Sequence, residues 1–196
     1  MLAIFPRPAQ LNDRGSWLAY WLFAAGAVDQ FRLTEATQNC PVNTTVIFVA
    51  GLTTTVLFDD FLERASFTSA IFILPGVTQV QNGWLKKCPH LQSVTFAGLS
   101  ALASVGNSWM QGCSELTSPS FVGLDALAFV GDMWMCSCHS LVAPSFAGLG
   151  ALVSIGKRWM IGCDGLTAPS FPGLLWDEPL RRFLLLRFFA GTRYTG

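Results

Sequence analysis

Residues 96–170 consist of three consecutive copies of one pattern. They read FAGLSALASVGNSWMQGCSELTSPS at 96–120, FVGLDALAFVGDMWMCSCHSLVAPS at 121–145 and FAGLGALVSIGKRWMIGCDGLTAPS at 146–170. The copies align without a gap at a period of 25 residues. A fixed period of this length is typical of solenoids, in which each repeat is one coil that buries its apolar side chains against its neighbours. The stretch therefore predicts a stack of coils.

Weaker copies lie upstream and set the predicted domain boundaries. VAGL at 49–52 echoes the FAGL start of the later copies, and residues 71–95 keep the apolar and cysteine offsets of the repeat. We predict a solenoid domain over residues 45–174, an N-terminal segment at 1–44 and a tail at 175–196. The matching residues of the upstream copy are Leu74, Val80, Trp84, Cys88 and Leu91.

Each coil is predicted to contain two short strands and a short helix. LQSVTF at 91–96 is partly β-branched and aromatic, which favours a strand, and Gly98 permits the bend that follows. ALASV at 101–105 predicts a second strand, and SWMQGC at 108–113 predicts one or two helical turns. The expected fold class is an α/β repeat, a solenoid of 25-residue coils.

Polar residues ahead of these turns are expected to cap them. Asn107 and Asp132 precede the turn in two copies, and Asp59 precedes DFLERA at 60–65, which also predicts a helix. A side-chain oxygen at such a position accepts a hydrogen bond from an unpaired backbone N–H of the first helical turn.

Three motifs resemble the leucine-rich repeat. Residues 91–99 follow L-x-x-L-x-L-x-x-L, while Met-x-x-Cys-x-x-Leu at 110–116 and Leu-x-x-Val-Gly at 102–106 are similar to the BspA-type subfamily. The Trp-Met variant also resembles repeats of large gene families in trypanosomatid-like protists. Two departures are that Met replaces the usual aromatic residue and Trp the usual Ala. The resemblance implies a ligand-binding or adhesive solenoid, such as a surface antigen, rather than an enzyme.

Prolines recur at a strand position of the later copies, at Pro119, Pro144 and Pro169. Because proline has no N–H to give to a ladder of hydrogen bonds, we predict that this sheet is interrupted in the last coils.

Cysteines recur at the repeat period, at Cys88, Cys113, Cys138 and Cys163. They are either a column of small buried side chains, stacked metal ligands or disulfide partners; we predict that all four are buried and reduced, since free cysteine is among the most buried residue types. Cys136 adds a C-x-C-H sequence, which is a weak zinc signal because zinc sites use wider spacings.

Tryptophans recur in the same way, at Trp84, Trp109, Trp134 and Trp159. They are predicted to form a core column, because the side chain carries a large apolar surface. The alternative is a partly exposed stripe that binds sugars or a partner.

The composition and motifs exclude several function classes. Charged residues make up 12% of the chain, the net charge is zero and no Lys or Arg occurs between Cys88 and Gly156, which argues against nucleic-acid binding. No G-x-S-x-G, P-loop or H-E-x-x-H motif is present. His90 and His139 fall in a variable turn. We expect no catalytic, cofactor-binding or metal site.

The N-terminal segment leaves two alternatives open. SWLAYWLFAAGAV at 16–28 is either the apolar part of a signal peptide spanning residues 1–27, or a helix that starts at Ser16, stops at Gly26 and covers the end of the solenoid. The first alternative places the protein outside the cell or on its surface, where Asn43 would be a glycosylation site; the second leaves it cytoplasmic. The stretch is too short for a transmembrane span.

The C-terminal tail leaves the repeat after Leu174. Leu180 to Ala190 is apolar on nearly all faces and carries Arg181, Arg182 and Arg187, which argues against a membrane span. It is either an irregular or helical cap or the end of a truncated repeat array.

The sequence therefore predicts a non-catalytic module for protein–protein interaction or adhesion, whose ligand is an unidentified protein. Variable hydroxyl and amide positions of the first strand are expected to point outward and to form the binding face. The alternative is a purely structural or self-associating repeat protein. The predicted binding residues are Gln92, Thr95, Thr117, Ser120, Thr167 and Ser170.

Overall fold

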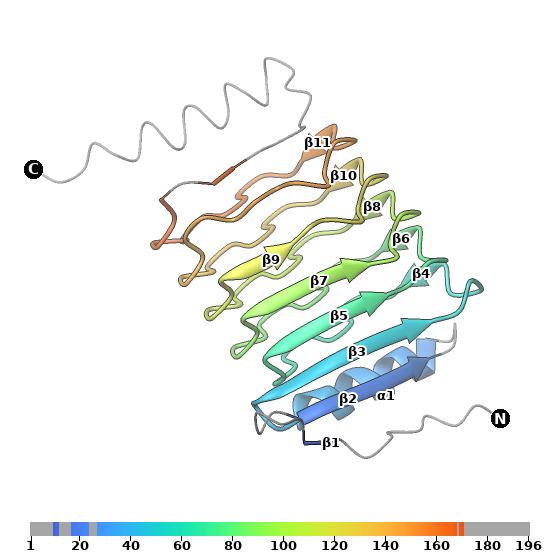
Figure 1. The fold of residues 1–196 in the computed structure, drawn as a ribbon. Helices are drawn as coiled ribbons and strands as arrows, with labels where there is room; N and C mark the ends of the chain where they lie inside the picture. Colours follow the sequence, from blue (N-terminus) through green and yellow to red (C-terminus); the bar gives the residue numbers. More distant parts are fainter. Residues whose placement is uncertain (1–9, 12–16, 24–26, 168, 171–196) are drawn as a thin grey trace, which may run out of the picture.

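The computed structural model describes residues 10–11, 17–23, 27–167 and 169–170. Its repeats form a β-solenoid of about five turns with two parallel sheets (Figure 1). The six-stranded sheet has the order β1 (Gln10–Leu11), β2 (Trp17–Phe23), β3 (Thr44–Ala50), β5 (Ser69–Ile73), β7 (Ser93–Ala97) and β9 (Ser118–Ser120). The five-stranded sheet has the order β4 (Val56–Leu57), β6 (Gln79–Val80), β8 (Ser104–Val105), β10 (Phe129–Val130) and β11 (Ser154–Ile155).

The strand register shows the repeat directly. Ala70 pairs with Val94, 24 residues further on, and Val94 pairs with Pro119, 25 residues further on. These pairs are parallel, as are all strand pairs of the two sheets except β1 with β2. The prediction of a stack whose coils carry two short strands is therefore confirmed as far as β9, after which only the strands of the five-stranded sheet continue.

Two columns of aromatic rings fill the interior. Trp84, Trp109 and Trp134 have no exposed surface, and their indoles lie 5.5 and 5.2 Å apart, centroid to centroid, with nearly parallel planes. The prediction that the tryptophans form a core column is confirmed, and Trp159, 3% exposed, continues it. A second column packs beside it and consists of Phe48, Phe72, Phe96, Phe121 and Phe146.

The predicted short helix of each coil is wrong. In place of a helix at 108–113, residues 107–112 form consecutive turns in which Ser108, Met110 and Gly112 have left-handed backbone angles, with φ of 62°, 54° and 73°. Residues 60–65, also predicted as a helix, form turns of the same kind. Helix α1 (Ala27–Gln38) is the only α-helix among the described residues.

Hydrogen bonds between coils explain this turn conformation. The Ser108 N–H donates to the Asp132 carbonyl of the next coil, whereas the Met110 N–H donates to the Trp84 carbonyl of the preceding coil. In a helix these groups would pair within the same segment. A left-handed residue costs about 1–2 kcal/mol, and the bonds to both neighbouring coils offset that cost.

The predicted caps act between coils and not on a helix. The Asn82 side-chain oxygen accepts the N–H of Asn107, the Asn107 oxygen accepts the N–H of Asp132, and the Asp132 oxygen accepts the N–H of Lys157. Asp59 begins this ladder by accepting the N–H of Asn82. Each side chain therefore pairs the equivalent backbone group one coil further on.

The N-terminal end is closed by a strand and a helix, not by the predicted helix at 16–26. Trp17–Phe23 forms β2, which pairs in parallel with β3, and α1 begins only at Ala27. Gln30 donates to the carbonyl of Val56 and accepts the N–H of Phe58, so α1 satisfies backbone groups of the first coil. The expected cap is present with different elements; the signal peptide stays a prediction.

The six-stranded sheet ends in isolated pairings toward the C-terminus. After β9, single bridges join Ser120 to Ser145 and Ser145 to Ser170. The predicted interruption is confirmed, since Pro144 has no N–H to offer the ladder. The predictions for the tail at 175–196 lie outside the described residues. Within the described ranges, no helix has the length and apolarity needed to cross a membrane.

Candidate binding surfaces

The outer face of the six-stranded sheet contains the predicted binding residues. Thr95 pairs with Ser120, and the bridges through Ser145 extend this row to Ser170. A second row lies where the chain enters the sheet, because the N–H of Thr117 donates to the carbonyl of Gln92. The structure thus brings the residues into two rows; all are exposed except Ser120, which is half-buried.

Two of the predicted hydroxyls also hold the coils together. The Thr117 hydroxyl donates to the carbonyl of Gln92 at 3.2 Å, and the Thr167 hydroxyl donates to the carbonyl of Val142 at 3.4 Å. Gln92 donates to the Glu115 carboxylate at 3.2 Å. Thr95 and Ser170 make no such side-chain bond and are freer to contact a ligand.

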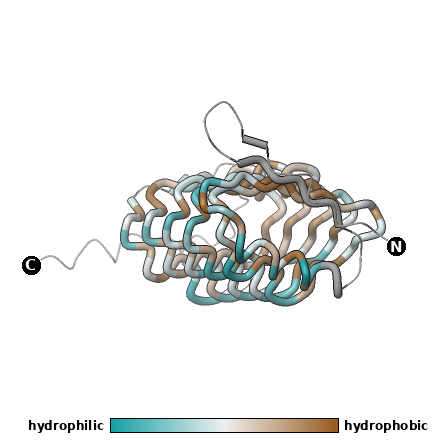
Figure 2. The backbone as a smooth tube through the Cα atoms, turned by 90° about the horizontal axis from the view of Figure 1, so that it is seen from below, coloured by the Kyte–Doolittle hydropathy of each residue, from teal (hydrophilic) through white to brown (hydrophobic). Residues whose placement is uncertain are grey.

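The same face is apolar toward the N-terminal end, a feature not predicted from the sequence. Ile47, Val49 and Ile71 lie half-buried on the outer side of β3 and β5, and Ile73 is 38% exposed. Figure 2 shows hydrophobic stretches concentrated in the strands toward this end. The signal was available, because VIFVA at 46–50 is apolar at every position and therefore on both faces of the strand.

The recurring cysteines bond to backbone carbonyls of the preceding coil. The Cys113 thiol donates to the Leu85 carbonyl at 3.0 Å, and the Cys138 thiol donates to the Met110 carbonyl at 3.1 Å. No cysteine of the described chain forms a disulfide. Cys88, Cys113 and Cys138 are buried as predicted; the prediction is wrong for Cys163, which is half-buried in the last described coil.

The thiols of the column differ in acidity, which predicts their order of reaction. Burial raises the pKa of Cys113 well above its usual value, whereas a hydrogen bond with the Cys138 thiol lowers the pKa of Cys163. At a given pH, Cys163 holds more of the reactive thiolate. Maleimide labelling of the folded protein, mapped by mass spectrometry, should modify Cys163 well before Cys113. Equal rates at the two sites, or a disulfide between neighbouring coils, would contradict this.

The weak zinc signal has no structural counterpart in the described chain. Cys138 is buried while Cys136 is half-buried, so the two thiols of the C-x-C-H sequence do not share a surface. Across the described residues, no three His, Cys, Asp or Glu side chains lie together in a way that would hold a metal ion.

The two histidines pair with carboxylates of the following coil. His90 Nδ1 lies 3.3 Å from Glu115, and His139 Nδ1 lies 3.0 Å from Asp164. Ser114, His139 and Asp164 occupy the same position in three successive coils, an order that resembles a catalytic Ser-His-Asp set. The Ser114 hydroxyl donates instead to the carbonyl of Pro89. The pairs therefore connect neighbouring coils at an exposed corner.

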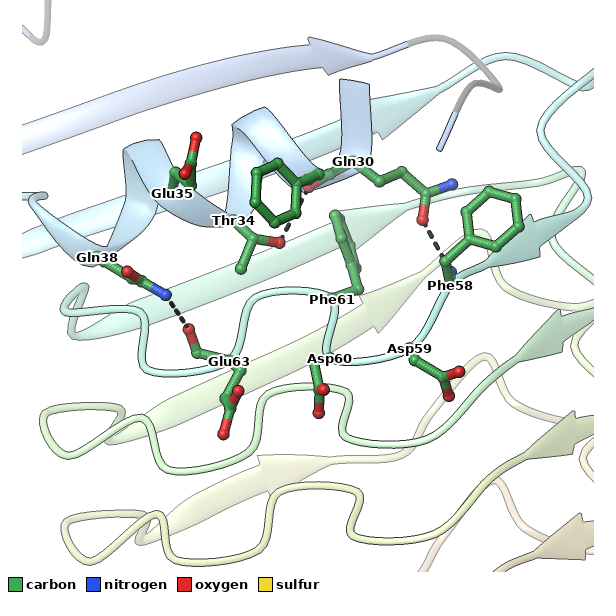
Figure 3. Close-up of a pocket in the computed structure, with 10 residues that line it drawn as sticks. Gln30, Thr34, Glu35, Gln38, Phe58, Asp59, Asp60, Phe61 and Glu63 are labelled. Atoms are coloured by element: carbon green, nitrogen blue, oxygen red, sulfur yellow. Dashed lines mark hydrogen bonds between the residues drawn. The ribbon is translucent and has the colours of Figure 1, made fainter. Parts of the chain in front are cut away.

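A groove between α1 and the first coil was not predicted. It has a volume of about 670 Å³ and is lined by α1 and by the turn at 58–63 (Figure 3). Phe31 at its rim is 65% exposed and Phe58 is 36% exposed. Its lining carboxylates come from both walls: Glu35, Asp59, Asp60 and Glu63.

No family model, curated protein or solved structure matches this chain. What is established is therefore the architecture, a β-solenoid with coils of about 24 residues.

Proposed function

We propose that the chain is a non-catalytic module for protein–protein interaction or adhesion, built on a BspA-type leucine-rich repeat. The burial pattern supports the repeat type. Leu91, Val94, Phe96 and Leu99, the four motif residues of the 91–99 segment, are all buried, and the residues between them are exposed or half-buried. This is the alternation that a leucine-rich repeat requires.

The observation that carries the proposal is the outer face of the six-stranded sheet. None of β3, β5, β7 and β9 contains an Asp, Glu, Lys or Arg. The face is apolar on β3 and β5 and rich in hydroxyls from β7 onward. An extended uncharged surface with an apolar end is typical of a protein-binding site.

A paired charge substitution tests the binding face. The variant Thr95→Glu with Ser170→Glu places charge on the face without breaking a side-chain bond between coils. A tagged version should no longer capture the partner that the unmodified chain captures from its native cell. Because the face is uncharged, capture by the unmodified chain should depend weakly on salt.

The matched control carries the same charges on the five-stranded sheet, as Gln79→Glu with Ser154→Glu, both at exposed positions. It should capture the partner at full strength. If both variants capture the partner equally well, the outer face of the six-stranded sheet is not the binding site.

A further inference from the structure

We propose that the groove between α1 and the first coil binds the arginine-rich segment PLRRFLLLRFFA, residues 179–190, of a second copy of this chain. Copies would thereby join head to tail. This inference is independent of the proposed function, because it concerns a different surface.

The shape and lining of the groove suit an apolar peptide segment. Its volume of about 670 Å³ lies within the usual range for ligand sites. Phe31 and Phe58 leave large parts of their rings exposed at its rim. The polar groups between α1 and the coil are already paired: the Thr34 hydroxyl accepts the N–H of Leu62, and Gln38 donates to the carbonyl of Glu63. The remaining surface is open for side chains of a ligand.

The charge of the groove selects a cationic ligand. Four carboxylates line it, and no Lys, Arg or His does. Lys86, 3.6 Å from Asp60 and 3.4 Å from Glu63, and Arg64, 3.9 Å from Glu63, offset part of that charge. Within the described chain, no cation pairs with Glu35 or Asp59. Carboxylates beside exposed aromatic rings form a site that arginine fits well, through ion pairs and stacking.

The chain itself contains a segment of matching chemistry. Residues 179–190 include Arg181, Arg182 and Arg187 and no acidic residue. One Leu precedes these arginines, four Leu and Phe residues lie between them, and two Phe residues follow them. Arginines can pair with Glu35 and Asp59, the two carboxylates without a cation partner in the described chain, while leucine and phenylalanine side chains contact the aromatic rim. No other stretch of this length carries three basic and as many large apolar residues.

The position of the groove favours a second copy over the same chain. The groove lies at the N-terminal end of the stack, and the described chain ends at the opposite end (Figure 1). From β3 to Ser170 there are five steps between neighbouring strands, or about 24 Å at strand spacing. To reach the groove of its own chain, the segment 179–190 would have to run back along the whole stack. The same segment of a second copy can enter the groove without doing so. Such an interface does not close by twofold symmetry and therefore propagates.

Sedimentation velocity of the full chain tests the assembly. At low salt the average mass should rise with concentration, and high salt should reverse the rise, because ion pairs at an exposed site are screened. The variant with Arg181→Glu, Arg182→Glu and Arg187→Glu should stay monomeric. So should Phe31→Ser with Glu35→Lys, which changes two exposed residues of α1. The matched control, Phe129→Ser with Asp125→Lys, makes the same changes away from the groove and should assemble like the unmodified chain.

A labelled synthetic peptide of residues 179–190 tests the groove directly. It should bind the full-length arginine variant, and the Phe31→Ser, Glu35→Lys pair of changes should weaken that binding at least about tenfold. Three results would overturn the proposal: a monomer at every concentration, an assembly that survives the groove substitutions, and peptide binding that the groove substitutions leave unchanged. Urea unfolding of each variant verifies that the coils remain folded.

Discussion

Replacing Trp134 with Ala is expected to lower the free energy of unfolding by about 3–5 kcal/mol. The Trp134 side chain has no exposed surface and lies in the middle of the stack. Its indole stacks on Trp109 at 5.2 Å and on Trp159 at 5.4 Å, and it makes edge contacts with Phe121 and Phe146. Truncation would leave a cavity that coils held in register on both sides cannot fill. The urea midpoint measures the loss.

The matched control is Phe129→Ala in the same coil. Phe129 is 54% exposed on the outer side of β10, so its truncation should change stability by about 0.5 kcal/mol. Equal shifts of the urea midpoint for Trp134→Ala and Phe129→Ala would contradict the assignment of the tryptophan column to the core.

Replacing Gly148 with Ala is expected to cost about 2–5 kcal/mol, since two separate penalties apply. Gly148 has a φ of 93°, which a residue with a side chain adopts only under strain. An added Cβ would also lie 2.3 Å from the Phe121 carbonyl oxygen and 2.8 Å from the Val122 Cα of the preceding coil. Both are backbone atoms, which cannot move without separating the coils. Gly98, in the same position of an earlier copy, has a φ of 71°, so the bend predicted there is present.

Gly51→Ala is the control for this substitution. The nearest atom to an added Cβ there is the Thr53 hydroxyl oxygen, 3.9 Å away, and the backbone is not left-handed. Thermal unfolding should therefore place Gly51→Ala close to the unmodified chain and Gly148→Ala well below it. A Gly148→Ala variant as stable as Gly51→Ala would show that the coils are not packed as closely as described.

The core residues could be predicted from the sequence because the same apolar residue types recur at a fixed period. Trp109, Met110, Cys113 and Leu116 recur as apolar residues at one period, and all four are buried. The turn at 108–113 could not be predicted, because its conformation depends on bonds such as that from the Met110 N–H to the Trp84 carbonyl, one coil away. Nothing local to this segment distinguishes it from a short helix.

The N-terminal cap shows the same limit. Trp17–Phe23 is apolar at almost every position, a pattern that fits a buried strand as well as a helix. This segment forms a strand because it pairs in parallel with β3, a contact that the local sequence does not show.

The candidate surfaces were predictable in part. Alternation in the repeat placed Thr95 and Ser170 on the outer face correctly. The groove could not be predicted from the sequence, because α1 and the turn at 58–63 come together to line it only in the folded chain.

The most direct test of the solenoid is the set of NOEs between tryptophan indoles, assigned by single Trp→Phe variants. Trp84 and Trp109 stack with parallel rings 5.5 Å apart, and Trp109 and Trp134 stack 5.2 Å apart. The structure predicts cross-peaks between each successive pair and none between Trp84 and Trp134, which lie two coils apart. The absence of cross-peaks between successive tryptophans, or a strong one between Trp84 and Trp134, would contradict the stacked coils.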